Sequence, residues 1–239
     1  MKALILNSGT GSRMLDLTND KPKCMTELYT GQTILSRQIE QLESLGFSEV
    51  IITTGPFAEV LEKHASLAAR SVKLVFVNNP EYATTNYIYS IFLSRDLLQD
   101  DIVLLHGDLV FSSEVLGEII NLPHSAAVVS SVLPLPQKDF KAVLTNGLIS
   151  AVGIEFFTEA VAMQPLYRLN KEDWLVWLSE IVAFIARGER KCYAENAFNL
   201  VSAHCEIHPF DVKHKLCAEI DTPGDLDFIN SVLKGECAG

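Results

Sequence analysis

The sequence opens with MKALILNSGTGSRM at residues 1–14, where an apolar run leads directly into a glycine-rich turn. Residues 2–7 are short and almost continuously apolar, which predicts a strand that is covered on both faces. Gly9 and Gly11 then allow the backbone to turn tightly or to approach a ligand closely. The stretch therefore predicts a buried strand followed by a loop whose backbone N–H groups can hold an anion.

Three kinds of phosphate-binding loop compete for this stretch. A dinucleotide fingerprint needs a third glycine, where Met14 stands, and an acid at the end of the second strand, which here ends in residues 53–55, Thr-Thr-Gly. A P-loop needs Gly-Lys-Ser/Thr, which is absent. The third kind is a glycine loop followed by basic residues, and Arg13 and Lys23 fit it. Such cations would neutralise the charge of a triphosphate.

Strands alternate with helices through the first half of the chain. The apolar patterns predict strands at 2–7, 49–55, 72–78 and 101–108, and helices at 33–45, 58–69 and 86–98. Strands and helices that alternate at this spacing are typical of βαβ units. The chain is therefore predicted to have an α/β fold with a mostly parallel sheet.

The second half is less regular. It predicts a strand at 125–135, a hairpin around Asn146-Gly147, a helix at 171–187 and a short strand at 217–221. Thr222 then supplies an N-cap for a last helix, with a proline and an acid in its first turn. No stretch looks like a linker. We expect one compact domain over 1–239, in which 135–215 forms a subdomain or lid on the sheet.

The composition excludes several classes of protein. The 239 residues are 48% hydrophobic and 21% charged, with a net charge of −11, so a nucleic-acid partner is not expected. The five cysteines include no C-x-x-C pair, which favours free thiols in a reducing compartment. No apolar run reaches the roughly 18 residues of a membrane span. We expect a cytoplasmic protein with no membrane partner, and the sequence predicts no oligomeric state.

These motifs resemble those of a known family. LNSGTGSRM followed by LTNDKPKCM is similar to the signature of the GT-A-like nucleotidyltransferases, which make NDP-sugars and CDP-alcohols. Residues 7–8, Asn-Ser, replace the usual Ala-Ala, while the glycines and basic residues are kept. The stretch YATTNYIYS is most similar to bacterial CTP:phosphocholine cytidylyltransferases. The resemblance implies a Rossmann-like GT-A fold, with helices on both faces of the sheet and a small acceptor-side subdomain.

The resemblance also implies a nucleotide site. Catalytic roles would fall on Arg13, Lys23 and Asp108. The residues that would bind the nucleotide are Leu6, Asn7, Ser8, Gly9, Gly11, Ser12, Arg13, Lys23, Thr85, Asn86, Ser90 and Gly107.

Two aspartates are candidates for holding a metal ion. Asp108 ends the strand at 101–108, and ligands bind at such strand ends in open α/β sheets. Asp221 ends a later strand, with Glu219 two residues earlier on the same face. Carboxylates that meet near a triphosphate suit Mg²⁺, and the resemblance gives that role to Asp108 and Asp221. Asp221 could instead cap the last helix, but Thr222 already fills that position.

The implied reaction is in-line attack by an acceptor phosphate on the α-phosphorus of CTP, with release of pyrophosphate. A phosphate monoester is already anionic near neutral pH, since its second pKa is about 6, so no general base is needed. The expected acceptor is a small phosphorylated amino alcohol such as phosphocholine. Aromatic rings and carboxylates bind quaternary ammonium groups, and the candidates are Tyr89, Tyr167, Trp174, Tyr193 and Glu195.

Other interpretations stay open at this point. The acceptor could be a phosphonate or another phosphorylated small molecule, or the chain could be a sugar-1-phosphate nucleotidyltransferase. A nucleotide-binding regulatory module without catalysis is a third possibility. Trp174 and Trp177 are three residues apart in a predicted helix, so at least one of them belongs to the core. His204 and His208 lack the ligand spacing of a zinc site.

Overall fold

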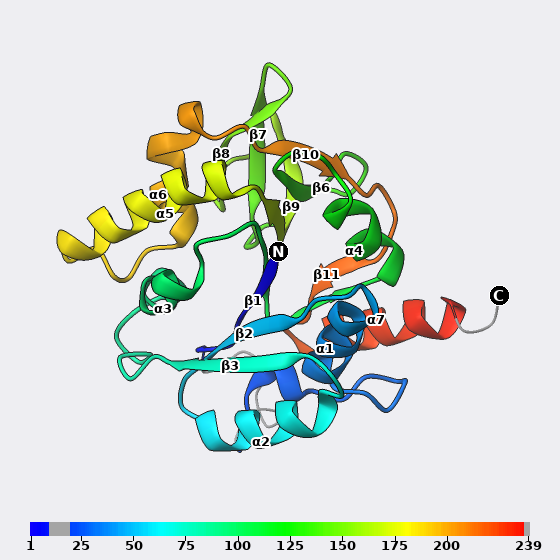
Figure 1. The fold of residues 1–239 in the computed structure, drawn as a ribbon. Coiled ribbons are helices and arrows are strands. Elements are labelled where there is room, and N and C mark those ends of the chain that lie inside the picture. Colours follow the sequence, from blue (N-terminus) through cyan, green and yellow to red (C-terminus); the bar gives the residue numbers. More distant parts are fainter. Residues whose placement is uncertain (10–19, 237–239) are drawn as a thin grey trace.

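The structure is a computed structural model that describes residues 1–9 and 20–236. Its central feature is a twisted sheet with the strand order β10-β6-β9-β4-β1-β2-β3 (Figure 1). The strands are β1 (Lys2–Leu6), β2 (Glu49–Thr54), β3 (Lys73–Asn78), β4 (Ile102–His106), β6 (Ala126–Ser130), β9 (Ala160–Leu169) and β10 (His208–Asp211). A hairpin of β7 (Lys141–Thr145) and β8 (Leu148–Gly153) is joined to the sheet through β9.

Four of the six pairings along this strand order are parallel. Strand β1 pairs in parallel with β2 and β4, β2 pairs in parallel with β3, and β6 with β10. Strand β9 runs antiparallel to both β4 and β6. The predicted α/β fold with a mostly parallel sheet is confirmed. The strand expected at 125–135 is shorter than predicted, because β6 ends at Ser130.

Helices cover both faces of the sheet because alternate strand residues point to opposite sides. Leu4 and Leu6 of β1 join one core cluster, whereas Ala3 and Ile5 join another. The first cluster is covered by α3 (Tyr87–Ser94), α5 (Lys171–Ala186) and α6 (Ala194–Val201). The second is covered by α1 (Ile34–Ser44), α2 (Ala58–Ala68) and α4 (Ser113–Ile120) (Figure 1). The helix expected at 86–98 ends at Ser94 and continues as a 3₁₀ turn, η3 (Arg95–Leu97).

Two local predictions in the second half are confirmed. Asn146 and Gly147 have φ values of 54° and 81°, and two positive values in succession are typical of a type I′ hairpin turn. The last helix, α7, spans Pro223–Glu236. Thr222 caps it, because the Thr222 hydroxyl accepts the N–H of Asp225 and the Asp225 carboxylate accepts the N–H of Thr222 at 2.7 Å.

A second, two-stranded sheet contains the short strand predicted at 217–221, but its pairing with a strand after β4 was not predicted. Strand β5 (Leu109–Phe111) pairs antiparallel with β11 (Cys217–Glu219). A third core cluster, which includes Val110 and Ile229, packs this small sheet against α7. The small sheet therefore joins the end of β4 to the segment that precedes α7, although they are separated by about a hundred residues of sequence. None of the helices in the described part of the chain is long and apolar enough to cross a membrane.

Candidate functional site

A cavity of about 350 Å³ lies where the carboxyl ends of β1 and β4 meet the small sheet. It brings together most of the residues that the sequence singled out, from segments far apart in the chain. The predicted site residues that line it are Leu6, Asn7, Ser8, Gly9, Lys23, Thr85, Asn86, Ser90, Asp108, Tyr193 and Asp221. Gly11, Ser12 and Arg13 lie outside the described residues.

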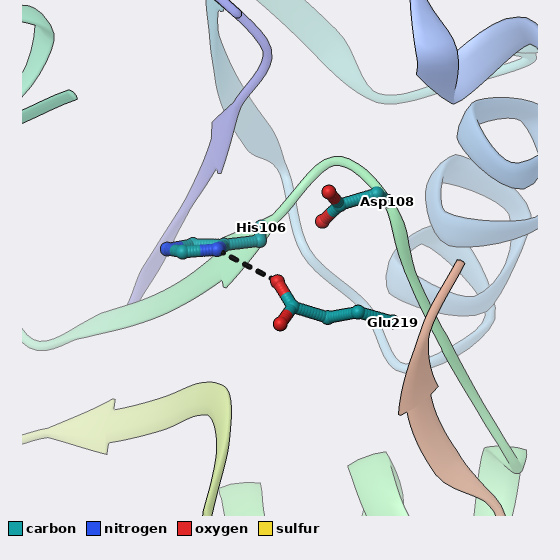
Figure 2. Close-up of side chains that lie close together, drawn as sticks. All are labelled: His106, Asp108 and Glu219. Atoms are coloured by element: carbon teal, nitrogen blue, oxygen red, sulfur yellow. Dashed lines mark hydrogen bonds and ion pairs between the residues drawn. The ribbon is translucent and has the colours of Figure 1, made fainter. Parts of the chain in front are cut away.

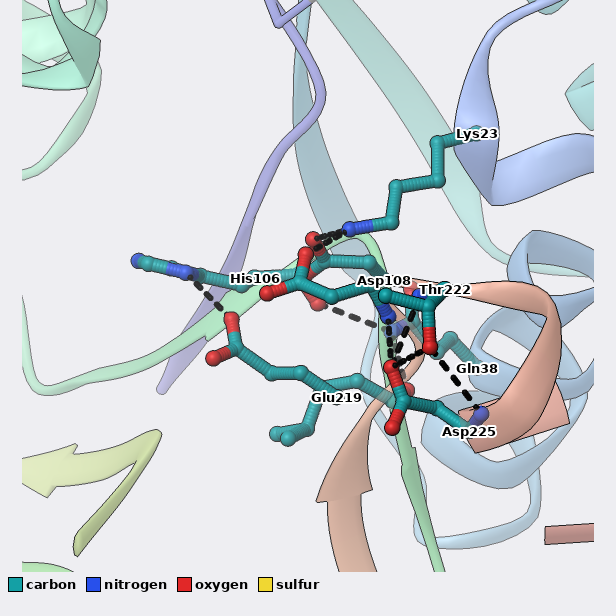
Figure 3. Close-up of polar contacts among 9 residues, drawn as sticks. Lys23, Gln38, His106, Asp108, Glu219, Thr222 and Asp225 are labelled. Atoms are coloured by element: carbon teal, nitrogen blue, oxygen red, sulfur yellow. Dashed lines mark hydrogen bonds and ion pairs between the residues drawn. The ribbon is translucent and has the colours of Figure 1, made fainter. Parts of the chain in front are cut away.

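Lys23 joins the two predicted metal-binding aspartates. Its ammonium group lies 2.7 Å from Asp108 Oδ2 and also contacts Asp221 Oδ1. All three side chains are mostly buried. Figure 3 shows the Lys23 side chain reaching toward the carboxylate of Asp108. The cation beyond the glycine loop and the carboxylates of the two strand ends therefore meet in one cavity.

The small sheet explains why these distant acids converge. Glu219 is paired opposite Leu109, and the N–H of Ile220 donates to the carbonyl of Asp108 at 3.0 Å. On the other side of this turn, Gln38 of α1 donates to the carbonyls of His106 (2.9 Å) and Leu109 (2.8 Å) (Figure 3). The turn that carries Asp108 is thus held from both sides, which fixes the position of its carboxylate.

His106, Asp108 and Glu219 form a compact cluster (Figure 2). One ligand atom from each lies within 4.8 Å of the others, and His106 Nδ1 is 3.0 Å from Glu219 Oε1. Burial and the nearby charge of Asp108 raise the pKa of Glu219 to about 7. Burial opposes protonation of His106, but the hydrogen bond with Glu219 raises the pKa of the imidazole above its usual value.

The Lys23–Asp108 contact changes the pKa of both groups. Burial alone would lower the pKa of the Lys23 ammonium, but Asp108 and Asp221 raise it above its ordinary value. Burial alone would raise the pKa of the Asp108 carboxyl, but Lys23 and His106 hold it below its usual range. Both groups therefore stay charged at neutral pH.

The site fits a hard divalent cation. The carboxylates of Asp108, Glu219 and Asp221 line the cavity together with Lys23 and His106. Asp108 Oδ1 is buried and has no hydrogen-bond partner in the described part of the protein. Oxygen donors, an excess of negative charge and an unpaired carboxylate oxygen are what Mg²⁺ requires. Two sets of residues could hold such an ion, Asp108 with Asp221 or Asp108 with His106 and Glu219, and Asp108 is common to both.

Hydrogen bonds connect the cavity residues at the end of β1 with those at the start of α3. Ser90 donates to the hydroxyl of Ser8 at 2.9 Å, and the Asn79 amide donates to Ser90 and Thr85, each at 3.1 Å. Asn86 caps α3. The end of β1 and the start of α3 are therefore fixed relative to each other. The loop after β3, which carries Asn79, belongs to the same network.

Gly107 does not line the cavity itself but packs against Asn7, which does. A Cβ atom at this position would lie 1.6 Å from Asn7 Oδ1. Its N–H donates to the carbonyl of Leu6 at 3.0 Å, so β1 and the turn after β4 are in close contact. Only glycine allows this approach.

The predicted acceptor residues are placed differently from the sequence expectation. Trp174 is fully buried, and its indole N–H donates to the carbonyl of Leu98, so it is a core residue outside the cavity lining. Tyr167 is 1% exposed and donates its hydroxyl to Glu195 Oε1 at 2.7 Å. Glu195, itself 1% exposed, also accepts the hydroxyl of Tyr87. Tyr167 and Glu195 therefore bond to each other and are not among the residues that line this cavity.

Tyr193 and two aromatic residues absent from the predicted set form one wall of the cavity. The ring of Tyr193 lies 5.2 Å from that of Phe140 and 5.9 Å from that of Tyr87. The rings of Tyr87 and His106 are arranged edge to face, with their centroids 4.8 Å apart. We refer to Tyr87, Phe140 and Tyr193 as the aromatic wall. Because it lies on the same cavity as Glu219, it provides both features that bind an organic cation.

Sequence reasoning missed Asn79 and Phe140 as cavity residues. Asn79 directly follows β3, and polar residues at the carboxyl ends of parallel strands are placed where ligands bind, so this signal was available. Phe140 stands just before β7 in a segment without a clear pattern. No feature of the sequence distinguishes it from a core phenylalanine.

Comparison with known proteins identifies the family of this chain and several similar enzymes. Residues 3–152 match the family described as the MobA-like NTP transferase domain. A CTP:phosphoglutamine cytidylyltransferase of Campylobacter jejuni is 28% identical over 82% of this chain and 82% of its own length. A CMP-5'-(3-aminopropyl)phosphonate synthase of Streptomyces rubellomurinus is 33% identical over 94% of this chain, which spans 37% of that protein.

A solved structure agrees with the architecture. The CTP:phosphocholine cytidylyltransferase from Streptococcus pneumoniae superposes with a TM-score of 0.79, covering 97% of this chain and 98% of its own. Because the two sequences are 20% identical, the likeness is one of fold. The predicted GT-A-like nucleotidyltransferase fold is confirmed.

Proposed function

This chain belongs to the MobA-like NTP transferase family, and we propose that it is a cytidylyltransferase that uses CTP. It transfers CMP to a small phosphorylated amino alcohol such as phosphocholine and releases pyrophosphate. One observation carries the proposal: Lys23, Asp108 and Asp221 meet in a cavity that begins at the glycine loop and includes the aromatic wall. A triphosphate and a cationic acceptor can then bind side by side.

The chain's own residues would bind and orient the two substrates. The backbone at Gly9 and the Lys23 ammonium hold phosphate oxygens of CTP. An oxygen of the acceptor's phosphate attacks the α-phosphorus and forms a new P–O bond, while the bond to the bridging oxygen breaks and pyrophosphate leaves with the electron pair. Because the attacking oxygen is already anionic, positioning and charge neutralisation are sufficient for catalysis.

Asp108 and Asp221 would hold a Mg²⁺ ion, with Glu219 as an alternative ligand. When bound, such an ion neutralises charge on the phosphates and orients them for in-line displacement. The carboxylate of Asp108 is already fixed by the contacts around its turn, so it presents its unpaired oxygen without rearrangement.

The aromatic wall supports an acceptor that carries a cationic amine. Its three rings and the Glu219 carboxylate line the same cavity, and cations are attracted to aromatic faces. A second candidate acceptor is a small aminoalkyl phosphonate. It is favoured by the similarity to the CMP-5'-(3-aminopropyl)phosphonate synthase of Streptomyces rubellomurinus.

Pyrophosphate release in the presence of Mg²⁺ tests the proposed function. Each of CTP, UTP, GTP and ATP is combined with phosphocholine, phosphoethanolamine, 2-aminoethylphosphonate or glucose 1-phosphate. We expect turnover with CTP and at least one amine-bearing acceptor. Turnover that requires glucose 1-phosphate would instead indicate a sugar-1-phosphate nucleotidyltransferase. CTP binding without turnover on any acceptor would indicate a regulatory module.

Replacing Tyr193 with alanine should raise the KM for phosphocholine about tenfold, because one face of the cation loses its ring. The KM for 3,3-dimethylbutyl phosphate, a neutral analogue of the same shape, should rise less. Steady-state kinetics with both acceptors measure this difference. Tyr193→Phe keeps the ring and should behave like the unmodified protein. An equal rise for the charged and neutral acceptors would contradict a cation-binding role.

Replacing Gly107 with alanine should weaken CTP binding about tenfold or more, because the added methyl group would displace the Asn7 side chain from the cavity. Calorimetric titration with CTP measures the change. Gly117→Ala is the matched control. Gly117 lies within helix α4, and a Cβ atom there would meet only a methyl group of Leu45, at 3.9 Å. That variant should bind CTP normally. Normal affinity in Gly107→Ala would remove Asn7 from the nucleotide site.

A further inference from the structure

Two loops that border the cavity of the candidate site are joined to each other by side-chain and backbone contacts. The first, 79–86, follows β3 and carries Asn79, Thr85 and Asn86 into the cavity lining. The second, 187–193, follows α5 and ends at Tyr193 of the aromatic wall. In the proposed function, the first loop is on the nucleotide side and the second is on the acceptor side.

Three side chains connect these loops. Tyr89 donates its hydroxyl to Glu81 Oε1 at 2.8 Å, and Arg190 Nη1 lies 3.2 Å from Glu81 Oε2. The Arg190 guanidinium also lies 5.0 Å from the centroid of the Tyr89 ring. A backbone bond reinforces the contact, since the N–H of Asn86 donates to the carbonyl of Arg190 at 2.8 Å. We refer to Glu81, Tyr89 and Arg190 as the loop clamp.

Glu81 is the residue through which the clamp reaches the cavity. Its backbone carbonyl accepts the hydroxyl of Thr85 at 2.8 Å, and its N–H donates to Asn79 Oδ1 at 2.9 Å. Asn79 in turn bonds Thr85 and Ser90, which line the cavity. The backbone of Glu81 is thus bonded to cavity residues, while its side chain binds the other loop.

The clamp residues do not line the cavity of the candidate site themselves. Glu81 and Arg190 instead line a neighbouring cavity of about 500 Å³ between the two loops. Tyr89, which the sequence predicts as an acceptor contact, has its hydroxyl bonded to Glu81. Any influence of these side chains on a substrate in the candidate site must therefore pass through the loops.

We propose that the loop clamp positions the nucleotide-side loop against the acceptor-side loop, so that Glu81, Tyr89 and Arg190 are positioning residues that set the affinity for the acceptor. This inference rests on the proposed function. The side chains of Arg190 and Glu81 are 40% and 43% exposed. The effect of this ion pair is therefore moderate and is screened by salt.

Hydrogen exchange tests the clamp without any acceptor. In Glu81→Gln, amides of 187–193 should exchange faster than in the unmodified protein, although the substitution lies in the other loop. In Arg190→Gln, amides of 79–86 should exchange faster. Unchanged exchange across the partner loop in both variants would overturn the proposal. This outcome is independent of turnover, so it is distinct from a failure of the proposed function.

Kinetics with the active acceptor give the second readout. Glu81→Gln and Arg190→Gln should each raise the acceptor KM about twofold to fivefold, with kcat nearly unchanged. The double variant should be no worse than either single one, because both remove the same contact. Arg190→Lys should recover part of the loss, and added salt should raise the acceptor KM of the unmodified protein toward that of the variants.

Arg187→Gln is the matched control. Arg187 stands at the end of α5, at the start of the second loop. It pairs with Glu189 at 2.8 Å and with Glu180 at 3.1 Å, and neither partner belongs to the first loop. Its removal should leave the acceptor KM and the exchange of 79–86 unchanged. Equal effects of the Arg187 and Arg190 variants would show that any lost surface charge acts alike, and would overturn the clamp.

Discussion

Replacing Asp108 with asparagine should lower kcat by about a thousandfold while the protein stays folded. Asp108 is the one carboxylate common to both possible ligand sets, and it is held in place by contacts on two sides of its turn. Asparagine keeps the size of the side chain but removes the charge that pairs with a divalent cation. Pyrophosphate release under saturating CTP and acceptor measures the loss, and circular dichroism checks the fold.

Two further variants at the site separate the ligand sets. If Asp221 is the second ligand, Asp221→Asn should match the loss of Asp108→Asn, while Glu219→Gln should retain more activity. The opposite order would assign the ion to the cluster of His106, Asp108 and Glu219. Asp96→Asn serves as the control, because this carboxylate is 83% exposed and lies outside the cavity lining. Near-normal kcat in Asp108→Asn would refute a metal role for this residue.

The first half of the fold could be predicted from sequence because its elements follow simple periods. Strands β1, β2 and β4 are apolar runs that are buried on both faces, β3 is an apolar, half-buried strand at the edge of the sheet, and helix α1 has its apolar residues on one face. Strand β9 could not be predicted in the same way, because Pro165 stands in its middle and proline argues against a central strand. Here β4 pairs with β9 only up to Leu166, and the β6 pairing shifts its register nearby. Pro165 therefore lies in a gap of both ladders.

The residues of the candidate site also differ in how far the sequence could predict them. Lys23, Asp108 and Asp221 could be identified because each stands in a motif with a fixed place, after the glycine loop or at a strand end. Among the aromatic candidates, the sequence could not separate cavity residues from core residues, since an aromatic residue in a sequence looks the same whether it lines a cavity or fills the core. Trp174 is fully buried, whereas Tyr193 is 36% exposed. Tyr193 directly precedes α6, a helix that the sequence did not predict.

Replacing Lys23 with methionine should lower kcat/KM by about a hundredfold to a thousandfold, since one charge that faces the transition state is lost. The same change should also destabilise the protein without ligands, because Asp108 and Asp221 then face each other without the ammonium between them. Breaking a buried ion pair costs about 3–5 kcal/mol, and partial hydration of this one reduces the loss. We expect Tm to fall by roughly 5–10 °C.

The loss of stability should be reversed by a divalent cation more strongly than in the unmodified protein. In the absence of nucleotide, the Lys23 ammonium competes with any cation that approaches the same two carboxylates, and methionine removes the competitor. Titration of Mn²⁺ without CTP, followed by Tm and by the electron paramagnetic resonance of free Mn²⁺, should therefore show tighter binding to Lys23→Met. Lys73→Met is the matched control, because Lys73 pairs with Glu49 at 2.7 Å on the surface and is 70% exposed. Equal Mn²⁺ affinity in Lys23→Met and the unmodified protein would mean that the ammonium and the metal do not share these carboxylates.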